Sequence, residues 1–376
     1  MKRFVVVNCF VVLAVVFLFD FFFGQYFLDY PTRKFAKQVV EQAQLEKGYR
    51  EAHPVFHHTL KPNVNREALW LSPPYKYRIC TNSNGFKISC LSKRNQDKEF
   101  DIAIIGDSFT EGVGLAFEKT FVGVIASNLS ELKIANLGVS GYSPSIYFHK
   151  IKYLLDRGVK FKHVIVFVDM SDVHNEAVHY EVVKGRVKDR ELVERSIFRT
   201  KPFDVDSRLW IKQRLSRFFP LTYNAARKLK MLATKGEKTF NYHPVPGVSW
   251  VHDQSATAYG EVGLPRAISL SVGYMEALYG ELRRLGISLS IVVYPWPDNL
   301  VFDIEDSPHV RLWSDFCKGK CVHFINLFPL FWDRVRLEGL ENSIMNYYFA
   351  GDVHFNAMGN QIIGEEIVRV LKNKSN

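Results

Sequence analysis

The sequence predicts an α/β fold in which a mostly parallel, five-stranded sheet lies between two layers of helices. From about residue 99 onward, short β-rich apolar runs alternate with helical patterns, and polar turns follow the first three runs. Such alternation favours parallel strands, because a helix between two strands returns the chain to the same end of the sheet. The predicted strands lie in the runs FDIAIIG, LKIANLGV, KHVIVFVDM, ISLSIVVYPW and CVHFINLF.

Two helices of this domain have recognisable ends. Ser143 is a suitable N-cap for a helix with Pro144 at its first position, which is predicted to run to about Asp156 before Gly158 ends it. A second, apolar-periodic helix is predicted from about Ala357 to Leu371.

The chain is expected to contain three regions. We assign residues 1–28 to a signal anchor, 29–98 to a stalk and an irregular cap, and 99–376 to the α/β domain. The strand–helix rhythm breaks at about 175–265, a basic and aromatic insertion that would form either a lid or substrate wall, or a plain structural elaboration. Five of its aromatic residues would either stack on sugar rings or belong to an ordinary core, namely Trp210, Tyr223, Tyr242, Trp250 and Tyr259.

The first thirty residues differ in kind from the rest. Lys2 and Arg3 precede an apolar, Phe-rich run from Phe4 to Phe23 that only Asn8 and Asp20 interrupt. No small-x-small cleavage site follows, so we expect an uncleaved anchor. A run of this length spans a bilayer, and the positive N-terminus would leave the remainder on the far side of it. We therefore predict a single-pass protein of the inner membrane with a periplasmic domain.

The cysteines indicate an oxidising compartment. Of the five cysteines, Cys9 lies in the predicted anchor, and the others form two close pairs, Cys80 with Cys90 and Cys317 with Cys321. An even number outside the anchor favours two local disulfides. A zinc site is the competing interpretation, but CxxxC has no second closely spaced pair. We predict no metal and no organic cofactor.

The charge balance is basic, with a formal net charge of +10. This charge would suit an acidic partner such as anionic lipid or an acidic polysaccharide, or it is simply a solvated basic surface. The lysines and arginines are spread out and no nucleic-acid-binding module is visible, so nucleic acid is excluded as a partner.

Polar turns follow the first two predicted strands. The first turn, GDSFTEG, places Ser108 near the start of a helix, whose free N–H groups would stabilise an oxyanion. The second, NLGVSGYS, contains glycines that let a backbone N–H approach a substrate closely. Ligands of open parallel sheets bind at the carboxyl ends of the strands, so donors from both turns would converge there.

A third polar segment, GDVHFN, immediately precedes the last predicted helix. A serine hydroxyl needs a neighbouring base, and the imidazole of that base must be oriented by a carboxylate or carbonyl. Ser108, His354 and Asp352 supply these three parts. Each also has a structural interpretation: GDS is a common turn, and Asp352 could cap the following helix.

These segments resemble sequence blocks of the SGNH (GDSL-like) hydrolases, a superfamily of esterases and acyltransferases. GDSFTEG is similar to the first block, NLGVSGYS to the second and DVHFNAMGN to the last, over roughly residues 101–371 apart from the insertion. The resemblance implies a flavodoxin-like three-layer sandwich, with Ser108 as nucleophile, His354 as base and Asp352 as its partner. It also implies that the N–H groups of Ser108 and Gly141 form the oxyanion hole. HPVFHHTLKPN and TNSNGFK further resemble membrane-anchored members associated with envelope polysaccharides.

Two features differ from the pattern of that superfamily. Its third block usually carries Gly-x-Asn-Asp, whose Asn donates to the oxyanion, whereas this chain has DMSD, with Ser171 as the replacement donor. Losing one oxyanion donor typically costs on the order of 100-fold or more in rate. One residue separates Asp352 from His354 where two are common, and this leaves Asp169 or Asp172 as an alternative partner of His354.

The sequence therefore predicts a serine esterase or O-acyltransferase that forms an acyl-enzyme on Ser108. The predicted substrate is an ester-linked acyl group, acetyl above all, on an envelope glycan, and the motifs do not separate hydrolysis from transfer. Two alternatives stay open. One is a lipid-directed esterase, because an anchored basic domain would lie close to anionic lipid; the other is a non-catalytic glycan-binding or assembly protein, because the third block is altered.

Overall fold

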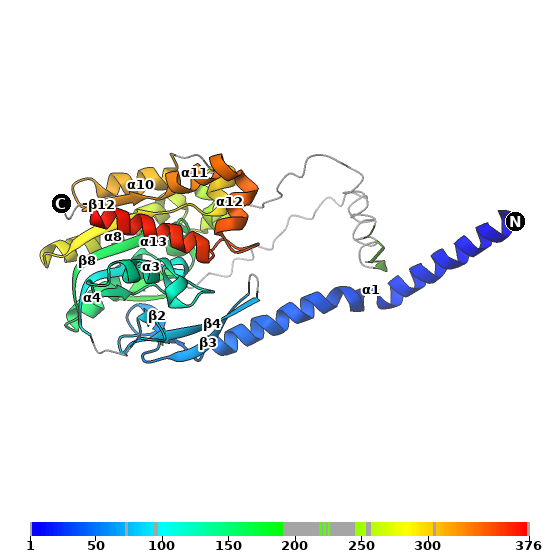
Figure 1. The fold of residues 1–376 in the computed structure, drawn as a ribbon, viewed down its shortest axis with the longest axis horizontal. Helices are drawn as coiled ribbons and strands as arrows, with labels where there is room; N and C mark the ends of the chain where they lie inside the picture. The colour runs from blue at the N-terminus through cyan, green and yellow to red at the C-terminus, as the bar shows by residue number, and fades with distance from the viewer. Residues whose placement is uncertain are drawn as a thin grey trace. The chain divides into compact units, whose positions relative to one another are not determined.

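The computed structural model describes residues 2–71, 74–92, 97–190, 218–219, 221–222, 225, 245–252, 257–303 and 306–373 (Figure 1). The chain forms two compact units, one from residues 1–41 and 193–241 and the other from residues 42–192 and 242–376. The second unit contains every described strand and the candidate site.

The predicted anchor lies within the helix α1 (Lys2–Glu46). Within the described residues, no helix is both long enough and apolar enough to cross a membrane, so the structure does not support the predicted transmembrane segment or its membrane contact. Asp20, which interrupts the apolar run, is buried and accepts hydrogen bonds from the backbone N–H groups of Leu221 (2.9 Å) and Thr222 (2.6 Å). Backbone N–H groups of the protein therefore satisfy this carboxylate.

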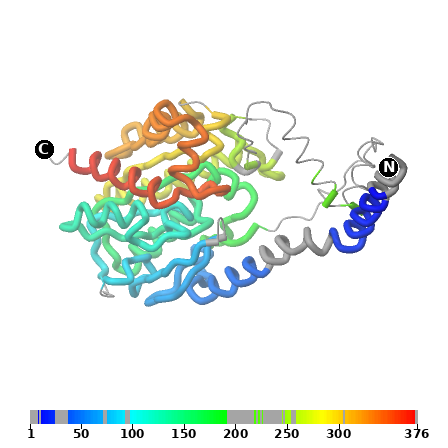
Figure 2. The backbone as a smooth tube through the Cα atoms, turned by 45° about the vertical axis from the view of Figure 1, so that its right-hand side comes forward, coloured from blue at the N-terminus to red at the C-terminus, as the bar shows by residue number. Residues whose placement is uncertain are grey.

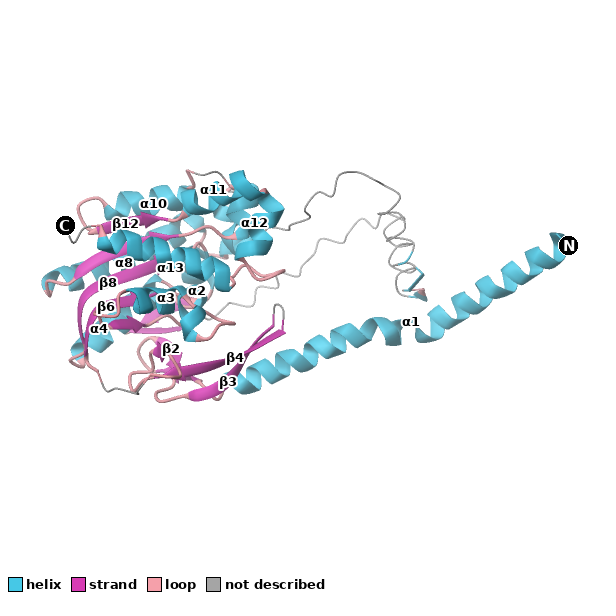
Figure 3. Cartoon of the chain, in the orientation of Figure 1, coloured by secondary structure: helices cyan, strands magenta, loops and turns pink. Residues whose placement is uncertain are grey.

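An eight-stranded sheet organises the second unit, in the order β12-β11-β8-β6-β7-β5-β4-β3 (Figure 3). The five predicted strands are all present and mutually parallel. Numbered along the chain, these five have the order 2-1-3-4-5, which is that of flavodoxin-like sheets. They are β6 (Glu99–Ile105), β7 (Ile134–Asn136), β8 (Lys160–Val168), β11 (Ser288–Val293) and β12 (His323–Asn326).

The prediction of a five-stranded sheet was wrong, because three antiparallel strands extend it beyond β7. They come from the region that we expected to be a stalk and an irregular cap. Its Pro- and Asn-rich sequence concealed them, although proline is tolerated at the first position of a strand, where Pro74 stands. A separate hairpin of β1 (Arg50–His53) and β2 (His57–Leu60) precedes β3 (Asn65–Leu71), β4 (Pro74–Thr81) and β5 (Lys87–Ile88).

Helices cover both faces of the sheet. Val164, Val166 and Val168 of β8 belong to one buried cluster with side chains of α4 and α8. On the opposite face, Phe167 stacks on Phe121 of α3 at 4.3 Å between ring centroids, and α3 lies beside α13 (Figures 1 and 2). Alternate residues of a strand point to opposite faces, so these contacts define the three expected layers. The helices are α2 (Ser108–Glu111), α3 (Phe121–Asn128), α4 (Pro144–Asp156), α5 (Ser171–Val178), α8 (Leu264–Arg284), α9 (Pro297–Phe302), α10 (Pro308–Cys317), α11 (Phe328–Glu338), α12 (Leu340–Tyr347) and α13 (Ala357–Lys372).

The two helices with predicted ends are confirmed. α4 begins at Pro144 and ends at Asp156, but the Ser143 hydroxyl donates to Glu176 Oε1 (2.6 Å) and makes no capping bond. α13 begins at Ala357, and the Asn356 side chain caps it by accepting hydrogen bonds from two backbone N–H groups of the first turn.

Parts of the predicted insertion are ordered against the α/β unit. β9 (Tyr180–Val183) and β10 (Arg186–Asp189) form a hairpin, and short 3₁₀ turns precede α8. Trp250 and Tyr259 are buried, and the Trp250 indole donates to the Met170 carbonyl (3.1 Å), so these two aromatic residues belong to the core. Trp210, Tyr223 and Tyr242 lie outside the described residues.

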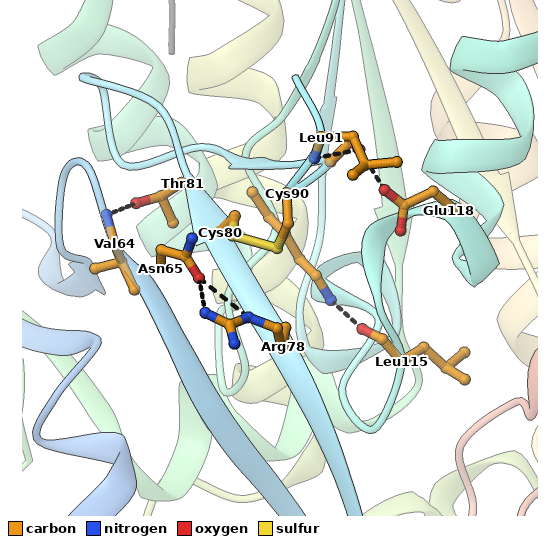
Figure 4. The surroundings of a disulfide bond; sticks show 11 residues. Val64, Asn65, Arg78, Cys80, Thr81, Cys90, Leu91, Leu115 and Glu118 are labelled. Atoms are coloured by element: carbon orange, nitrogen blue, oxygen red, sulfur yellow. Dashed lines mark hydrogen bonds between the residues drawn. A yellow bond between two sulfur atoms is a disulfide. The ribbon is translucent and has the colours of Figure 1, made fainter. Parts of the chain in front are cut away.

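Both predicted disulfides are present. Cys80, in β4, is joined to Cys90, which follows β5 (Figure 4), and Cys317 is joined to Cys321. All four sulfur atoms are therefore used in covalent bonds, which rules out the competing zinc interpretation for these pairs.

Candidate active site

Three of the predicted site residues form one chain of hydrogen bonds. Ser108 Oγ lies 2.8 Å from His354 Nε2, and His354 Nδ1 lies 2.8 Å from Asp352 Oδ1. Nδ1 must carry a proton to bond to the ionised carboxylate, so a neutral imidazole leaves Nε2 as the acceptor of the serine proton. The three residues thus have the arrangement of a nucleophile, a general base and an orienting carboxylate.

Ser108 is placed by the turn that follows β6. Asp107 caps α2 by accepting a hydrogen bond from the N–H of Phe109 (3.0 Å), and Ser108 is the first helical residue. Its N–H therefore has no acceptor within the helix. β6 lies between β7 and β8, at the point where the strand order of the parallel sheet reverses. Ligands of such sheets bind in the crevice at this point, so the fold places Ser108 where a substrate is expected.

His354 lies between two aromatic side chains. The Phe109 ring lies 4.6 Å from the imidazole, and the Trp70 ring meets it edge-on at 4.9 Å. The loop that carries His354 is held by a backbone hydrogen bond from Phe349 N–H to the His354 carbonyl (2.9 Å). These contacts restrict the rotation of the imidazole and keep Nε2 directed at Ser108.

Asp352 accepts several hydrogen bonds at once. Besides His354, its donors are the Trp70 indole N–H (2.5 Å) and the Val353 backbone N–H (2.6 Å). Burial raises the pKa of this carboxyl, but the hydrogen bond and charge of His354 and the Trp70 indole outweigh burial, so the pKa lies below its ordinary value. Asp352 is therefore ionised at neutral pH, as the partner of an imidazole must be.

Trp70 was not found from the sequence. It lies in β3, within a region predicted to be an irregular cap, and 282 residues separate it from Asp352. No spacing rule connects positions so far apart. The single signal was a tryptophan in the short run NREALWL, and this run does not distinguish a site residue from a core residue.

The turn after β7 packs against α2, the helix that begins at Ser108. Asn136 fixes the turn, because its side chain donates to the Thr110 carbonyl (2.9 Å) and accepts from the Gly138 N–H (3.0 Å). A Cβ on Gly138 would lie 2.6 Å from the backbone nitrogen of Glu111, so only glycine fits. Gly141 has φ +82°, a left-handed conformation that favours glycine. The two candidate oxyanion turns therefore pack directly against each other.

Ser171 lies at the carboxyl end of β8, as expected, but it faces Asp169. Its backbone N–H donates to Asp169 Oδ1 (2.6 Å), and its hydroxyl also bonds to that carboxyl group. The alternative partners of His354 are bound elsewhere. Asp169 accepts from the Trp296 indole (2.7 Å), and Asp172 accepts from the Tyr147 hydroxyl (3.1 Å). Asp352 is thus the carboxylate that contacts His354.

Three buried carboxyl groups lie beneath the nucleophile. Burial raises the pKa of Asp107 well above its ordinary value, and the neighbouring Asp169 raises it further. Burial likewise raises the pKa of Asp169, and burial with the charges of Asp169 and Asp107 raises that of Asp172. The Tyr294 hydroxyl contacts both Asp169 (3.0 Å) and Asp107 (3.5 Å). Burial and mutual repulsion therefore favour the protonated forms of these carboxyl groups.

Known proteins offer only distant likenesses. No family model and no curated protein matches the chain. Among solved structures, TesA is 11% identical with a TM-score of 0.39, covering 73% of this chain and 98% of its own. A putative lipolytic protein of the G-D-S-L family from Desulfitobacterium hafniense is 14% identical with a TM-score of 0.38, covering 73% of this chain and 99% of its own.

A mutant of Axe2, an acetylxylan esterase from Geobacillus stearothermophilus, is 12% identical with a TM-score of 0.37, covering 72% of this chain and 93% of its own. Likenesses this low carry no information about the reaction. We therefore infer the activity from the geometry of the site alone.

Proposed function

We propose that this protein is a serine esterase or O-acyltransferase that forms an acyl-enzyme on Ser108. One observation carries the proposal, namely the chain of 2.8 Å hydrogen bonds from Ser108 through His354 to Asp352. A serine hydroxyl that meets an unprotonated imidazole nitrogen, itself oriented by an ionised carboxylate, is equipped for attack on a carbonyl group.

The reaction begins when Ser108 Oγ attacks the ester carbonyl and its proton passes to His354 Nε2. The resulting oxyanion accepts hydrogen bonds from the N–H groups of Ser108 and Gly141, whereas the N–H and hydroxyl of Ser171 are already bonded to Asp169. When the intermediate collapses, the ester C–O bond breaks and His354 returns the proton to the departing alcohol. Water or a second hydroxyl then attacks the acyl group, gives its proton to His354 and releases Ser108 by the reverse sequence.

For the substrate, we propose ester-linked acyl groups, acetyl above all, on a glycan outside the cytoplasm. The two disulfides support an oxidising compartment. Hydrolysis and transfer share the step that forms the acyl-enzyme, and the acceptor alone separates them. Adding a soluble sugar acceptor should raise the rate of acyl-enzyme turnover in a transferase and leave it unchanged in a hydrolase.

The test uses the full chain with a short-chain chromogenic ester and a fluorophosphonate probe for reactive serines. We expect wild-type protein to release the alcohol and to take up one probe per chain, with the probe mapped to Ser108 by peptide mass spectrometry. Ser108→Ala should lose both properties while keeping the wild-type melting temperature. Folded wild-type protein that neither turns over the ester nor reacts with the probe would refute the proposal and favour a glycan-binding protein.

A comparison of esters separates the two substrate classes. Turnover of acetylated sugars over long-chain acyl lipids is the expected result for a glycan esterase. The opposite preference would replace the glycan proposal with a lipid-directed esterase but would leave the role of Ser108 intact.

A further inference from the structure

The backbone of Ser140 and Gly141, in the turn after β7, is held by three separate contacts. The Ser140 N–H donates to Glu111 Oε2 (2.7 Å), and the Ser140 carbonyl lies 2.8 Å from His58 Nε2. The Gly141 carbonyl accepts from the Tyr180 hydroxyl (2.7 Å). Among the described residues, the fourth backbone group, the Gly141 N–H, has no acceptor. The contacts thus leave unbonded the N–H that the proposed reaction assigns to the oxyanion.

His58 contacts the same peptide unit that carries this N–H. The Ser140 carbonyl and the Gly141 N–H belong to one planar trans peptide, so the two groups point in opposite directions. A donor that fixes the carbonyl therefore fixes the direction of the N–H. Hydrogen bonding at the carbonyl also polarises the peptide, which makes its N–H a better donor.

We propose that His58 is a positioning residue for the oxyanion hole, acting through the Ser140–Gly141 peptide. This inference rests on the proposed esterase reaction and extends it to a residue of the N-terminal segment. His58 touches neither reacting atom. Its effect is to hold the Gly141 N–H in the direction that a tetrahedral intermediate requires, before the substrate arrives.

The direction of the hydrogen bonds follows from the groups involved. A carbonyl only accepts, so His58 Nε2 carries a proton. Burial lowers the pKa of His58 to about 4, so the ring is neutral and its Nδ1 is an acceptor. His57 Nδ1 lies 2.7 Å from this nitrogen, and His57 Nε2 lies 2.9 Å from Asp189 Oδ1. A series of hydrogen bonds therefore runs from Asp189 in β10 through His57 and His58 to the Ser140 carbonyl.

The backbone around His58 supports the same role. His57 adopts φ +74°, a left-handed conformation that is uncommon for a residue other than glycine. Such conformations persist only where the surroundings enforce them. The Tyr142 hydroxyl donates to the His58 carbonyl (2.7 Å), so the turn after β7 and the strand β2 hold each other from both sides.

The test compares two substitutions of nearly equal size in the full chain. His58→Gln keeps a side-chain N–H that can reach the Ser140 carbonyl, whereas His58→Met has no donor. With a short-chain ester, we expect His58→Met to lower kcat by about 10-fold or more with KM unchanged, because the contact serves the transition state. The loss should stay below the roughly 100-fold or larger effect of deleting an oxyanion donor outright. His58→Gln should recover most of kcat.

His163 provides a matched control. It is also a buried histidine whose pKa burial lowers to about 4, and its Nε2 bonds to the Ser290 hydroxyl (2.8 Å), away from the turn after β7. His163→Gln should therefore leave kcat unchanged. If His58→Met fails to fold, Asp189→Asn tests the role of His58 instead. The Asp189 side chain is 87% exposed, so this change should leave the fold intact and remove only the far end of the series of hydrogen bonds. A two- to threefold fall in kcat with KM unchanged is the expected result.

Wild-type kcat in folded His58→Met, or in Asp189→Asn where the first variant is unfolded, would overturn the role of His58. Equal losses of kcat in His58→Gln and His58→Met would also overturn it, because the donor would then not be what matters. If the esterase proposal is wrong, the result differs, because wild-type protein itself would show neither ester turnover nor serine labelling. The inference about His58 would then also be wrong.

Discussion

The reacting groups and the groups that hold them come from different parts of the chain. Ser108 follows the first parallel strand, and His354 and Asp352 precede the last helix. Their supports come from the N-terminal segment: Trp70 contacts Asp352 across 282 residues, and His58 contacts Ser140 across 82. The α/β core therefore supplies the reacting groups, and antiparallel strands of the N-terminal segment, β2 of the separate hairpin and β3 of the large sheet, supply the groups that hold them.

Buried charged groups join the N-terminal segment to the nucleophile helix α2. Glu111 is fully buried and pairs with Arg50 (2.8 Å), while its second oxygen accepts from the N–H of Ser140. The Lys87 ammonium donates to three carbonyl groups at the end of α2 and beyond, including that of Leu115 (2.7 Å). Breaking a buried pair on one side is strongly destabilising, so the N-terminal segment is tied firmly to the nucleophile helix.

The largest expected effect comes from the base. His354→Ala should lower kcat by on the order of 10⁴-fold or more, because Ser108 then has no acceptor for its proton. Thermal unfolding measures separately what the loss of the imidazole, whose side chain is 12% exposed and packs on Phe109 and Trp70, costs in stability. Steady-state kinetics with a chromogenic ester checks the rate, and activity within 10-fold of wild type would remove His354 from the mechanism.

Asp352→Asn should have the second largest effect on kcat. We expect kcat to fall by on the order of 10³- to 10⁴-fold, because the amide no longer holds the imidazole in the correct tautomer. The pKa of Asp352 is depressed in the folded protein, so its carboxylate stabilises the fold above the ordinary carboxyl pKa, and this contribution disappears as pH falls through the folded value. Urea unfolding should show wild type losing stability between about pH 5 and pH 3 more steeply than Asp352→Asn. Parallel pH profiles would argue against an ionised, bonded Asp352.

Trp70→Phe tests how much the N-terminal segment contributes to catalysis by holding Asp352. The ring that packs on His354 is kept, but the indole N–H that donates to Asp352 is lost. A fall in kcat of about 10-fold, with KM unchanged, is expected for one neutral donor to a charged group. An unchanged kcat would show that His354 and the backbone hold Asp352 unaided.

Lys150 should affect stability more than activity. Its ammonium is buried, donates to the Leu137 carbonyl (3.0 Å) and the Tyr142 hydroxyl (3.1 Å), and has its pKa lowered to about 7 by burial. Between pH 7 and the ordinary lysine value near 10.4, the unfolded chain binds more protons, so stability should rise with pH across this window. Lys150→Met should lack that rise in urea unfolding, and an identical pH dependence in both proteins would contradict the depressed pKa.

The sequence was sufficient to predict the parallel strands, because the apolar runs and turn motifs that mark them involve residues close together in the chain. Apolar runs located all five parallel strands, and two short motifs identified Ser108, His354 and Asp352, which the structure joins by hydrogen bonds. The antiparallel strands were missed because their Pro- and Asn-rich sequence concealed them, although β3 pairs with β4 and β4 with β5, close by in the sequence. Trp70 and His58 were missed for another reason, since no periodicity marks a residue that acts by touching a distant segment.

The most direct test of the proposed mechanism is to trap the acyl-enzyme. Wild-type protein is mixed with an excess of activated ester and quenched in acid within the first turnover, and its peptides are analysed by mass spectrometry. The account predicts a burst of one alcohol per chain and one acyl group on the peptide that contains Ser108, neither of which appears in Ser108→Ala. Turnover that persists in Ser108→Ala, or an acyl group on another residue, would contradict it.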